Sequence, residues 1–279
     1  MVKIVADTTS GLPHDMLKSL NIPLIPQIVI FGEDSYRDDT ELDTATFLAK
    51  LKASSGLPKT AAPPPALYIP IFTEAKKQGE SVIVIAPSEK VSGTVRAAMV
   101  AMQDFPDLDV RVVDSLTVAG NLGSLVLMAD EWAKSGMDAD TLVKQLNDWI
   151  RRGRIYFLVN TLEYLQKGGR IGGAKALIGK MLQVKPILCV TAGQVEPFEQ
   201  QRTKKRALAR LLEIVEDQCP KSSDAHLCVM HADAMAEAGE LVVELKSRMN
   251  LDSIPIYELP PAIVVHGGPG VLAVGFFVH

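Results

Sequence analysis

The residues whose types and spacing point most directly to chemistry are Ser92, Gly93 and Thr94. They follow an unbroken apolar run at residues 82–86, typical of a strand covered on both faces, and precede apolar residues at helical spacing. This order predicts that the three residues lie at a helix N-terminus. The unpaired N–H groups there carry partial positive charge, and two hydroxyls beside a glycine let an anion approach the backbone. The same residues also fit a simple helix cap, so the pattern leaves capping and anion binding both open.

Three further side chains are candidates for an anion site. Thr60 lies in a proline-rich segment, residues 56–65, which predicts a rigid loop that holds its hydroxyl in place. Arg170 lies in a glycine-dense loop, and its guanidinium fork suits a carboxylate or a phosphate, although such an arginine is also common on loop surfaces. His266 begins a second glycine-rich loop, residues 266–270, where it either faces a cleft or fills the surface.

The sequence lacks motifs that bind nucleotides or activate a nucleophile. The glycine-rich segments do not have P-loop spacing or open a helix directly after a strand, and no GxSxG sequence is present. The acidic residues between 32 and 43 do not have EF-hand spacing, and we expect them to form a solvated loop. Cys189, Cys219 and Cys228 have no metal-binding or disulfide spacing. We therefore expect no catalytic residue, no metal site and no cofactor.

Composition is that of an ordinary globular protein and argues against several classes of partner. Of the 279 residues, 47% are hydrophobic and 22% are charged, and the formal net charge is -4. Without a basic excess or a basic block, we expect no nucleic-acid partner and no attachment to an anionic membrane surface. The N-terminus has no signal-peptide pattern, and no stretch reaches the ~18 consecutive apolar residues of a spanning helix. The sequence thus predicts a cytoplasmic protein without stable membrane insertion.

The elements that must position these residues alternate between strands and helices in the first half of the chain. Strands are predicted near residues 2–6, 81–86 and 110–113, each followed by a polar loop and a helix. This alternation indicates a parallel α/β sheet, whose ligands bind outside the carboxyl ends of the strands. A proline-interrupted run at residues 22–31 is expected to form an edge or irregular strand.

The pattern changes near residue 153. Beyond this point a strand at residues 155–159 is followed by a glycine-dense loop and then by a hairpin that turns at Ala192-Gly193-Gln194. Strands and helices continue to the end of the chain. The sequence therefore predicts an α/β protein of two domains, residues 1–153 with the anion site and residues 154–279.

Short motifs along the whole chain resemble those of the DegV family. In order, they are Asp7-Thr8-Thr9-Ser10, Lys59-Thr60, Ser92-Gly93-Thr94, Asp114-Ser115, residues 162–171, Lys185-Pro186-Ile187-Leu188 and His266-Gly267-Gly268-Pro269-Gly270. The resemblance implies a DegV-like α/β fold with a parallel sheet in the N-terminal domain, a mixed sheet in the C-terminal domain, and one long-chain fatty acid between them. It also implies a carrier without enzyme activity, which presents the acyl carboxylate to a separate ATP-using fatty-acid kinase for acyl-phosphate formation in lipid metabolism.

The resemblance also implies which residues contact the ligand. These are Thr60, Ser92, Gly93, Thr94, Arg170 and His266. The hydroxyls of Thr60 and Ser92 would hold the carboxylate. The backbone amides of Gly93 and Thr94 would assist, and the side chains of Arg170 and His266 would lie near the headgroup or its exit. This chain departs from the family at residues 61–64, which read Ala-Ala-Pro-Pro in place of Ser-Gln-Pro-Ser. Two hydroxyls and an amide are missing there, which leaves a different headgroup or a different kinase partner open.

Simple energetics favour a lipid over a polar metabolite. Burial of about 14 methylenes at roughly 0.8 kcal/mol each gives ~11 kcal/mol of gross stabilisation before the costs of association. A carboxylate contributes less, because its hydrogen bonds mainly offset the cost of removing it from water. The alternative function is a small-molecule transferase or kinase-like enzyme that uses the same anion site for a phosphate.

Overall fold

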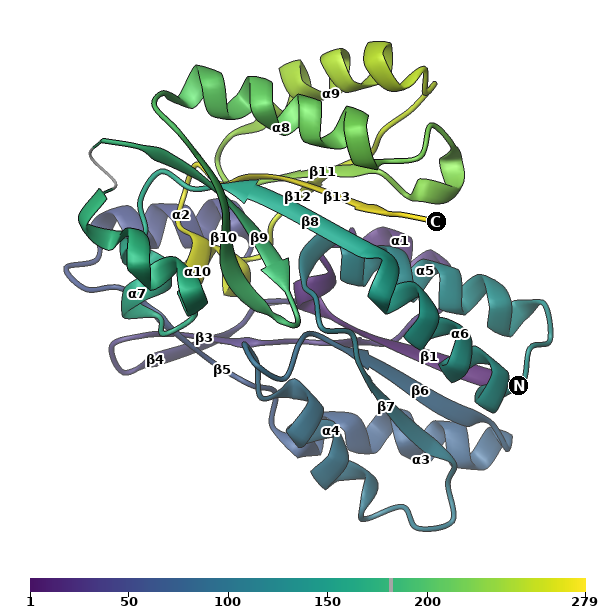
Figure 1. Ribbon diagram of the computed structural model, residues 1–279. Coiled ribbons are helices and arrows are strands. Elements are labelled where there is room, and N and C mark those ends of the chain that lie inside the picture. Colours follow the sequence, from purple (N-terminus) through teal and green to yellow (C-terminus); the bar gives the residue numbers. More distant parts are fainter. Residues whose placement is uncertain (181–182) are drawn as a thin grey trace.

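Three β-sheets organise the part of the chain that the computed structural model describes, residues 1–180 and 183–279 (Figure 1). The four-stranded sheet is parallel, and its strands are, in spatial order, β2 (Leu24–Ile25), β1 (Val2–Asp7), β6 (Ser81–Ala86) and β7 (Val110–Asp114). The six-stranded sheet is mixed and consists of β10 (Gln194–Gln201), β9 (Lys185–Thr191), β8 (Gly153–Leu158), β13 (Leu272–Phe277), β11 (Cys228–His231) and β12 (Ile256–Glu258). The three-stranded sheet is antiparallel and consists of β4 (Asp34–Arg37), β3 (Ile28–Phe31) and β5 (Lys59–Ala61).

Helices cover both larger sheets. The α-helices are α1 (His14–Ser19), α2 (Thr44–Ala53), α3 (Ile69–Gln78), α4 (Thr94–Met102), α5 (Ala119–Lys134), α6 (Ala139–Arg152), α7 (Glu163–Lys167), α8 (Lys204–Gln218), α9 (Met235–Met249) and α10 (Pro261–Gly267). Short 3-10 segments are η1 (Thr8–Ser10), η2 (Pro65–Tyr68), η3 (Gly172–Lys180) and η4 (Ser223–Ala225).

The parallel sheet has the buried centre that its sequence predicts. Ile83 and Ile85 of β6 pack against α1, α5 and α6 on one face, whereas Val82 and Val84 pack against α3 and α4 on the other. A strand covered on both faces needs such a continuous apolar run. The proline-interrupted run at residues 22–31 is indeed irregular, because it divides into β2 and β3, which belong to different sheets.

The mixed sheet has one face under helices and one face toward the rest of the molecule. Tyr156 and Leu158 of β8 point to the core under α8 and α9. Ile155 and Phe157 alternate with them and face the opposite side, where the core includes residues of β3, α2 and α10. Since α6 ends at Arg152 and β8 begins at Gly153, the chain passes from one sheet to the other near residue 153. The division into domains 1–153 and 154–279 stays a prediction.

Two segments expected to be loops contain strands. The acidic segment 32–43 includes β4 and the proline-rich segment 56–65 includes β5, and both strands pair with β3. Asp38, expected in a solvated loop, is only 4% exposed and accepts a hydrogen bond of 2.8 Å from the backbone N–H of Gln27. Burial raises the pKa of Asp38 to about 7. The prediction of a solvated loop is wrong here, because the pairing partner lies in another segment that local composition does not reveal.

The prediction for the second glycine-rich loop also needs a correction. His266 lies in the last turn of α10, not in a loop. Pro261 suits the first position of a helix, because the N–H group that proline lacks would have no partner within the helix at that position. Val264 and Val265 are both fully or almost fully buried in the core, so packing outweighs the preference of β-branched residues for strands.

Candidate ligand-binding pocket

A pocket lies between the carboxyl edge of the parallel sheet and the inner face of the mixed sheet. It encloses about 1010 Å³ of empty space, open solvent at its mouth included, and ligand pockets are typically ~300–1,000 Å³. The loops after β1 and β6 contribute Thr9 and Ser92, and the mixed sheet contributes Ile155 and Ala273. The pocket is therefore at the edge where a parallel sheet is expected to bind its ligands.

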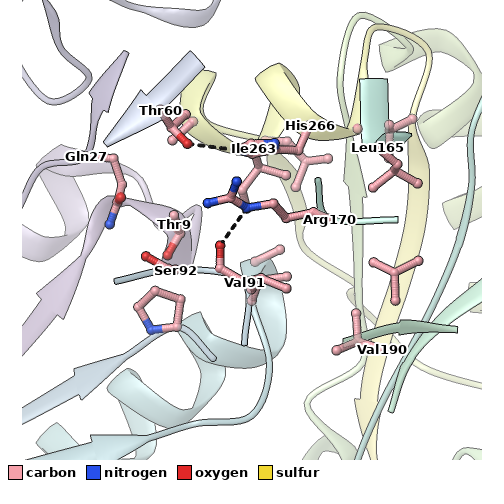
Figure 2. Close-up of a pocket in the computed structure, with 18 of the residues that line it drawn as sticks. Thr9, Gln27, Thr60, Val91, Ser92, Leu165, Arg170, Val190, Ile263 and His266 are labelled. Atoms are coloured by element: carbon pink, nitrogen blue, oxygen red, sulfur yellow. Dashed lines mark hydrogen bonds between the residues drawn. The ribbon is translucent and has the colours of Figure 1, made fainter. Parts of the chain in front are cut away.

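Five of the six candidate residues line this single pocket (Figure 2). They are Thr60, Ser92, Gly93, Arg170 and His266, and Figure 2 labels all of them except Gly93. These residues come from β5, from the loop between β6 and α4, from the glycine-rich loop after α7, and from α10. The fold thus joins segments that are up to about two hundred residues apart, as the hydrogen bond between the first and last of them shows. Together they form the polar end of the pocket.

Thr60 and His266 form one wall of this polar end. Thr60 stands opposite Val29 in the β3–β5 pair, and its Oγ1 lies 2.8 Å from Nε2 of His266. Burial, with a smaller contribution from the positive charge of Arg170, lowers the pKa of His266 to about 4, so the ring is neutral near neutral pH. Its Nδ1 is buried and has no hydrogen-bond partner among the described residues. A Cβ at Gly168 would lie 2.3 Å from this nitrogen, so only glycine fits there.

Ser92 and Gly93 form the opposite wall at the start of α4. The Ser92 Oγ lies 2.8 Å from Oγ1 of Thr94 and accepts the Thr94 backbone N–H at 3.3 Å. The Ser92 hydroxyl therefore binds the first N–H of α4 and also lines the pocket. A Cβ on Gly93 would lie 3.1 Å from the Cβ of Ala62, which also lines the pocket. Ala62, one of the positions at which this chain departs from the family pattern, is thus part of the wall beside Ser92.

Thr94 lies behind this wall and not in it. Its side chain is fully buried and its hydroxyl contacts Asp7 and Gln27, while its backbone N–H donates to Ser92. The expected direct contact of Thr94 with a ligand therefore has no counterpart in the pocket lining. Its place is that of a support for Ser92.

Arg170 connects the glycine-rich loop to the Ser92 loop. Its Nε donates to the carbonyl oxygen of Val91 at 3.0 Å (Figure 2). Its Nη1 donates to the carbonyl oxygen of Gly168 at 2.7 Å. The guanidinium thus fixes the backbone next to Ser92 and brings a positive charge to the pocket. Its remaining N–H groups are those that suit an anion.

The rest of the pocket lining is mostly apolar. Its walls include Val118, Ile155, Phe157, Leu165, Val195 and Ala273. Most of these side chains belong to one continuous core cluster that also packs the mixed sheet against α10 and β3. An apolar ligand segment is favoured here, because it removes both its own surface and that of the walls from water.

Sequence reasoning missed Gln27, which lines the pocket and is 4% exposed. Its Nε2 donates to Oδ2 of Asp7 at 2.6 Å and to Oγ1 of Thr94 at 2.8 Å. Burial raises the pKa of the Asp7 carboxyl, and the hydrogen bonds from Thr9, Gln27 and Thr94 oppose this rise. A single amide in an otherwise apolar, proline-interrupted run was the available signal.

Two features are absent from residues 1–180 and 183–279. No group of three or more histidine, cysteine, aspartate or glutamate residues there is arranged to hold a metal ion. Within the same residues, no helix is both long enough and apolar enough to cross a membrane.

Comparison with known proteins decides the family. A family model described as "Uncharacterised protein, DegV family" matches residues 1–279. The chain belongs to the DegV family. A DegV domain-containing protein from Halalkalibacterium halodurans is 32% identical over 279 residues, which is 100% of this chain and 99% of the relative. Protein DegV from Bacillus subtilis is 34% identical over 248 residues, or 88% of each chain.

Solved DegV structures share the fold. The crystal structure of DegV from Bacillus subtilis, described as a fatty acid binding protein, has a TM-score of 0.89 and 31% identity, and covers 100% of this chain and 99% of its own. A DegV family protein from Thermus thermophilus, described by its fatty acid binding, has a TM-score of 0.89 and 29% identity with the same coverage. The predicted DegV-like fold, with a parallel and a mixed sheet, is thereby confirmed.

Proposed function

We propose that this DegV family chain binds one long-chain fatty acid in the pocket between the two larger sheets. One observation carries the proposal: a polar end built from hydroxyl, amide and guanidinium groups and a largely apolar interior belong to the same pocket. A fatty acid has the same division along its length. The fatty-acid binding of the DegV structures from Bacillus subtilis and Thermus thermophilus supports the same ligand class.

The carboxylate is assigned to the polar end. In this proposal the hydroxyls of Thr60 and Ser92 donate to its oxygens, and the Gly93 amide at the start of α4 adds a third donor. The neutral His266 ring holds the Thr60 hydroxyl, and Arg170 supplies positive charge. Hydrogen bonds to a charged group contribute about 1.5–3 kcal/mol each, which offsets much of the cost of removing the carboxylate from water.

The acyl chain is assigned to the apolar interior. At roughly 0.8 kcal/mol per buried methylene, the tail contributes more than the headgroup, and its length decides the affinity. In the proposed two-domain division, residues 1–153 supply most of the polar end and residues 154–279 cover the chain. A phosphate-transferring enzyme would gain nothing from such an interior.

We further propose that the chain acts as a carrier that presents the acyl carboxylate to a separate fatty-acid kinase. The polar end supports this role because Gly93, beside the assigned carboxylate, is exposed to solvent. A kinase can reach a carboxylate at the mouth while the tail stays buried. With the kinase and ATP, trapping of acyl phosphate by hydroxylamine is expected to depend on the presence of this chain.

Native mass spectrometry of the purified protein tests the ligand assignment. A co-purified adduct of ~250–300 Da, the mass of a fatty acid with a tail of about 14–16 methylenes, is expected. Calorimetric titration of delipidated protein with hexadecanoate should give one site per chain. Inorganic phosphate serves as the competing ligand. Binding of phosphate without binding of hexadecanoate would replace the carrier by the phosphate-using alternative.

A further inference from the structure

We infer that Asp7 and Gln27 are positioning residues that orient the Ser92 hydroxyl, so that its hydrogen points into the pocket and Ser92 donates to an anion. The inference rests on the proposed function, because the anion is the carboxylate of the fatty acid. It extends that function to residues that do not touch the headgroup. The four side chains involved, which include Thr94, lie on β1, on the segment before β3, and at the start of α4.

The Asp7 carboxylate fixes the orientation of the Gln27 amide. Oδ1 of Asp7 accepts two hydrogen bonds from Thr9, one from the backbone N–H at 2.8 Å and one from the hydroxyl at 2.5 Å. Oδ2 is left to face Gln27, and the nitrogen of the amide lies 2.6 Å from it. The donors of Thr9 and Gln27 favour the ionised form of Asp7 against the burial that raises its pKa. Against an ionised Asp7, the reverse orientation would place the amide oxygen next to a carboxylate oxygen, two acceptors without a hydrogen between them.

The orientation of the Gln27 amide then limits the hydrogen bonds that the Thr94 hydroxyl can make. Gln27 donates its second amide hydrogen to Oγ1 of Thr94 at 2.8 Å. Thr94 has one hydroxyl hydrogen and two acceptors in reach, Oγ of Ser92 at 2.8 Å and Oδ2 of Asp7 at 3.3 Å. The shorter contact is to Ser92, so the hydrogen is directed toward the pocket wall.

Ser92 completes the relay. Its Oγ accepts from the Thr94 backbone N–H at 3.3 Å and lies 2.8 Å from the Thr94 hydroxyl. With the Thr94 hydrogen directed to Ser92, these two bonds use both lone pairs of the Ser92 oxygen. The remaining function of the hydroxyl is its own hydrogen, and Ser92 lines the pocket. A carboxylate accepts that hydrogen. If the Thr94 hydrogen went to Asp7 instead, Ser92 would donate back to Thr94 and would present a lone pair to the carboxylate.

The substitution Asp7→Asn removes the arrangement of hydrogen bonds that makes Ser92 a donor, with almost no change in the shape of the side chain. The Thr9 backbone N–H can only donate, so the oxygen of Asn stays at the Oδ1 position and its NH₂ group faces Gln27. The Gln27 amide must then turn its oxygen toward both Asn and Thr94. Thr94 donates to that oxygen, Ser92 donates to Thr94, and the pocket loses its hydroxyl donor.

Asp38→Asn is the matched control. Asp38 is also a buried carboxylate and also contacts Gln27, but through the backbone N–H and not through the amide side chain. Its Oδ2 has no hydrogen-bond partner in the part of the chain that the structure describes, so an NH₂ group there leaves Gln27 as it is. We expect Asp38→Asn to bind like the wild type.

The experiment measures the binding of hexadecanoate and of 1-hexadecanol to delipidated wild type, Asp7→Asn and Asp38→Asn. The pH of the measurement is well above the pKa of hexadecanoic acid. A hydroxyl headgroup can donate to Ser92 as well as accept, whereas a carboxylate only accepts. We expect Asp7→Asn to lose about tenfold or more in affinity for hexadecanoate, since one charge-assisted bond is lost. Its affinity for 1-hexadecanol should change by less than about threefold.

The outcomes separate the relay from the proposed function. Equal loss for both ligands in Asp7→Asn means a purely structural role, and no loss for either means that Asp7 does not orient Ser92; both overturn the inference. Failure of the wild type to bind hexadecanoate overturns the proposed function itself. If Asp7→Asn does not fold, Gln27→Met removes the amide donor at similar size, and the same shift in ligand preference decides the question.

Discussion

The polar end and the apolar interior of the pocket are built from different parts of the chain and by different interactions. The polar end uses side chains on loops and element ends, each held by hydrogen bonds, such as Thr60 to His266 and Ser92 to Thr94. The interior uses strand residues such as Ile155 and Phe157, held by packing in a core cluster. Burial of a tail scales with its length, whereas a polar end largely offsets desolvation. The comparison indicates that the interior sets affinity and the polar end sets orientation.

The two walls of the polar end differ as well. Ser92 is supported by a closed network of buried groups that includes Asp7 and Gln27. Within residues 1–180 and 183–279, the Thr60 hydroxyl has one hydrogen bond, to His266, and the other ring nitrogen of His266 has no partner. A supported hydroxyl needs no reorganisation when a ligand binds, so Ser92 should contribute more than Thr60.

The largest effect is expected from filling the interior. Ala273 on β13 is 3% exposed and lines the pocket. In Ala273→Phe the ring occupies the space of about four methylenes, so the affinity for hexadecanoate should fall roughly a hundredfold. Calorimetric titration measures this loss, and thermal unfolding checks the fold. Val243→Phe, at a position that is 69% exposed on α9, is the control. Unchanged affinity in Ala273→Phe would show that the interior does not hold the tail.

The buried histidine of the polar end should make stability depend on pH. Because the fold lowers the pKa of His266 from 6.5 to about 4, the unfolded chain binds a proton more readily than the folded one between these values. The stabilisation is complete above pH 6.5 and is lost as pH falls toward about 4, which amounts to about 3 kcal/mol. Urea unfolding at several pH values measures it.

His266→Gln provides the comparison for this pH dependence. Glutamine does not titrate, so the difference in unfolding free energy between the variant and the wild type should change by about 3 kcal/mol over this range. Carboxylates elsewhere titrate equally in both proteins and cancel. Parallel curves would mean that the His266 ring charges freely in the folded state.

The next effect on ligand affinity is expected from removal of the Ser92 hydroxyl, which the buried network supports. Ser92→Ala removes one hydrogen bond to a charged group, so the affinity for hexadecanoate should fall about tenfold to a hundredfold without being abolished. Titration with hexadecanoate measures the change. Ser135→Ala, at the exposed end of α5, is the control. Complete loss of binding would reverse the comparison, because it would make the polar end the main source of affinity.

What the sequence could predict followed from local patterns. The apolar run that becomes β6 and the hydroxyl–glycine segment before α4 lie next to each other in the chain, so Ser92 could be placed correctly. Gln27 could not, because its partner Thr94 is 67 residues away. The buried Asp38 and the helix around His266 were missed for the same reason, since packing against distant elements decides both.

The six candidate residues illustrate the same limit. Motif order was sufficient to choose residues of one pocket, since five of the six line it. It did not give the direction of a side chain. The Thr94 hydroxyl lies behind the pocket wall between Gln27 and Ser92, and two donors of Arg170 are used on backbone carbonyl oxygens. These choices depend on the complete set of hydrogen-bond partners, which only the folded chain provides.

The smallest effect is expected at the Thr60 wall. Thr60→Val keeps the shape of the side chain and removes its hydroxyl, which is partly exposed and bonded to a neutral ring. A hydrogen bond to the carboxylate contributes about 1.5–3 kcal/mol, and the weaker support of Thr60 puts its loss at the lower end, so the affinity for hexadecanoate should fall about tenfold. Titration beside Ser92→Ala ranks the two walls directly. A larger loss in Thr60→Val than in Ser92→Ala would mean that the carboxylate is anchored by the wall with a single hydrogen bond, and that the buried network behind Ser92 serves folding and not the ligand.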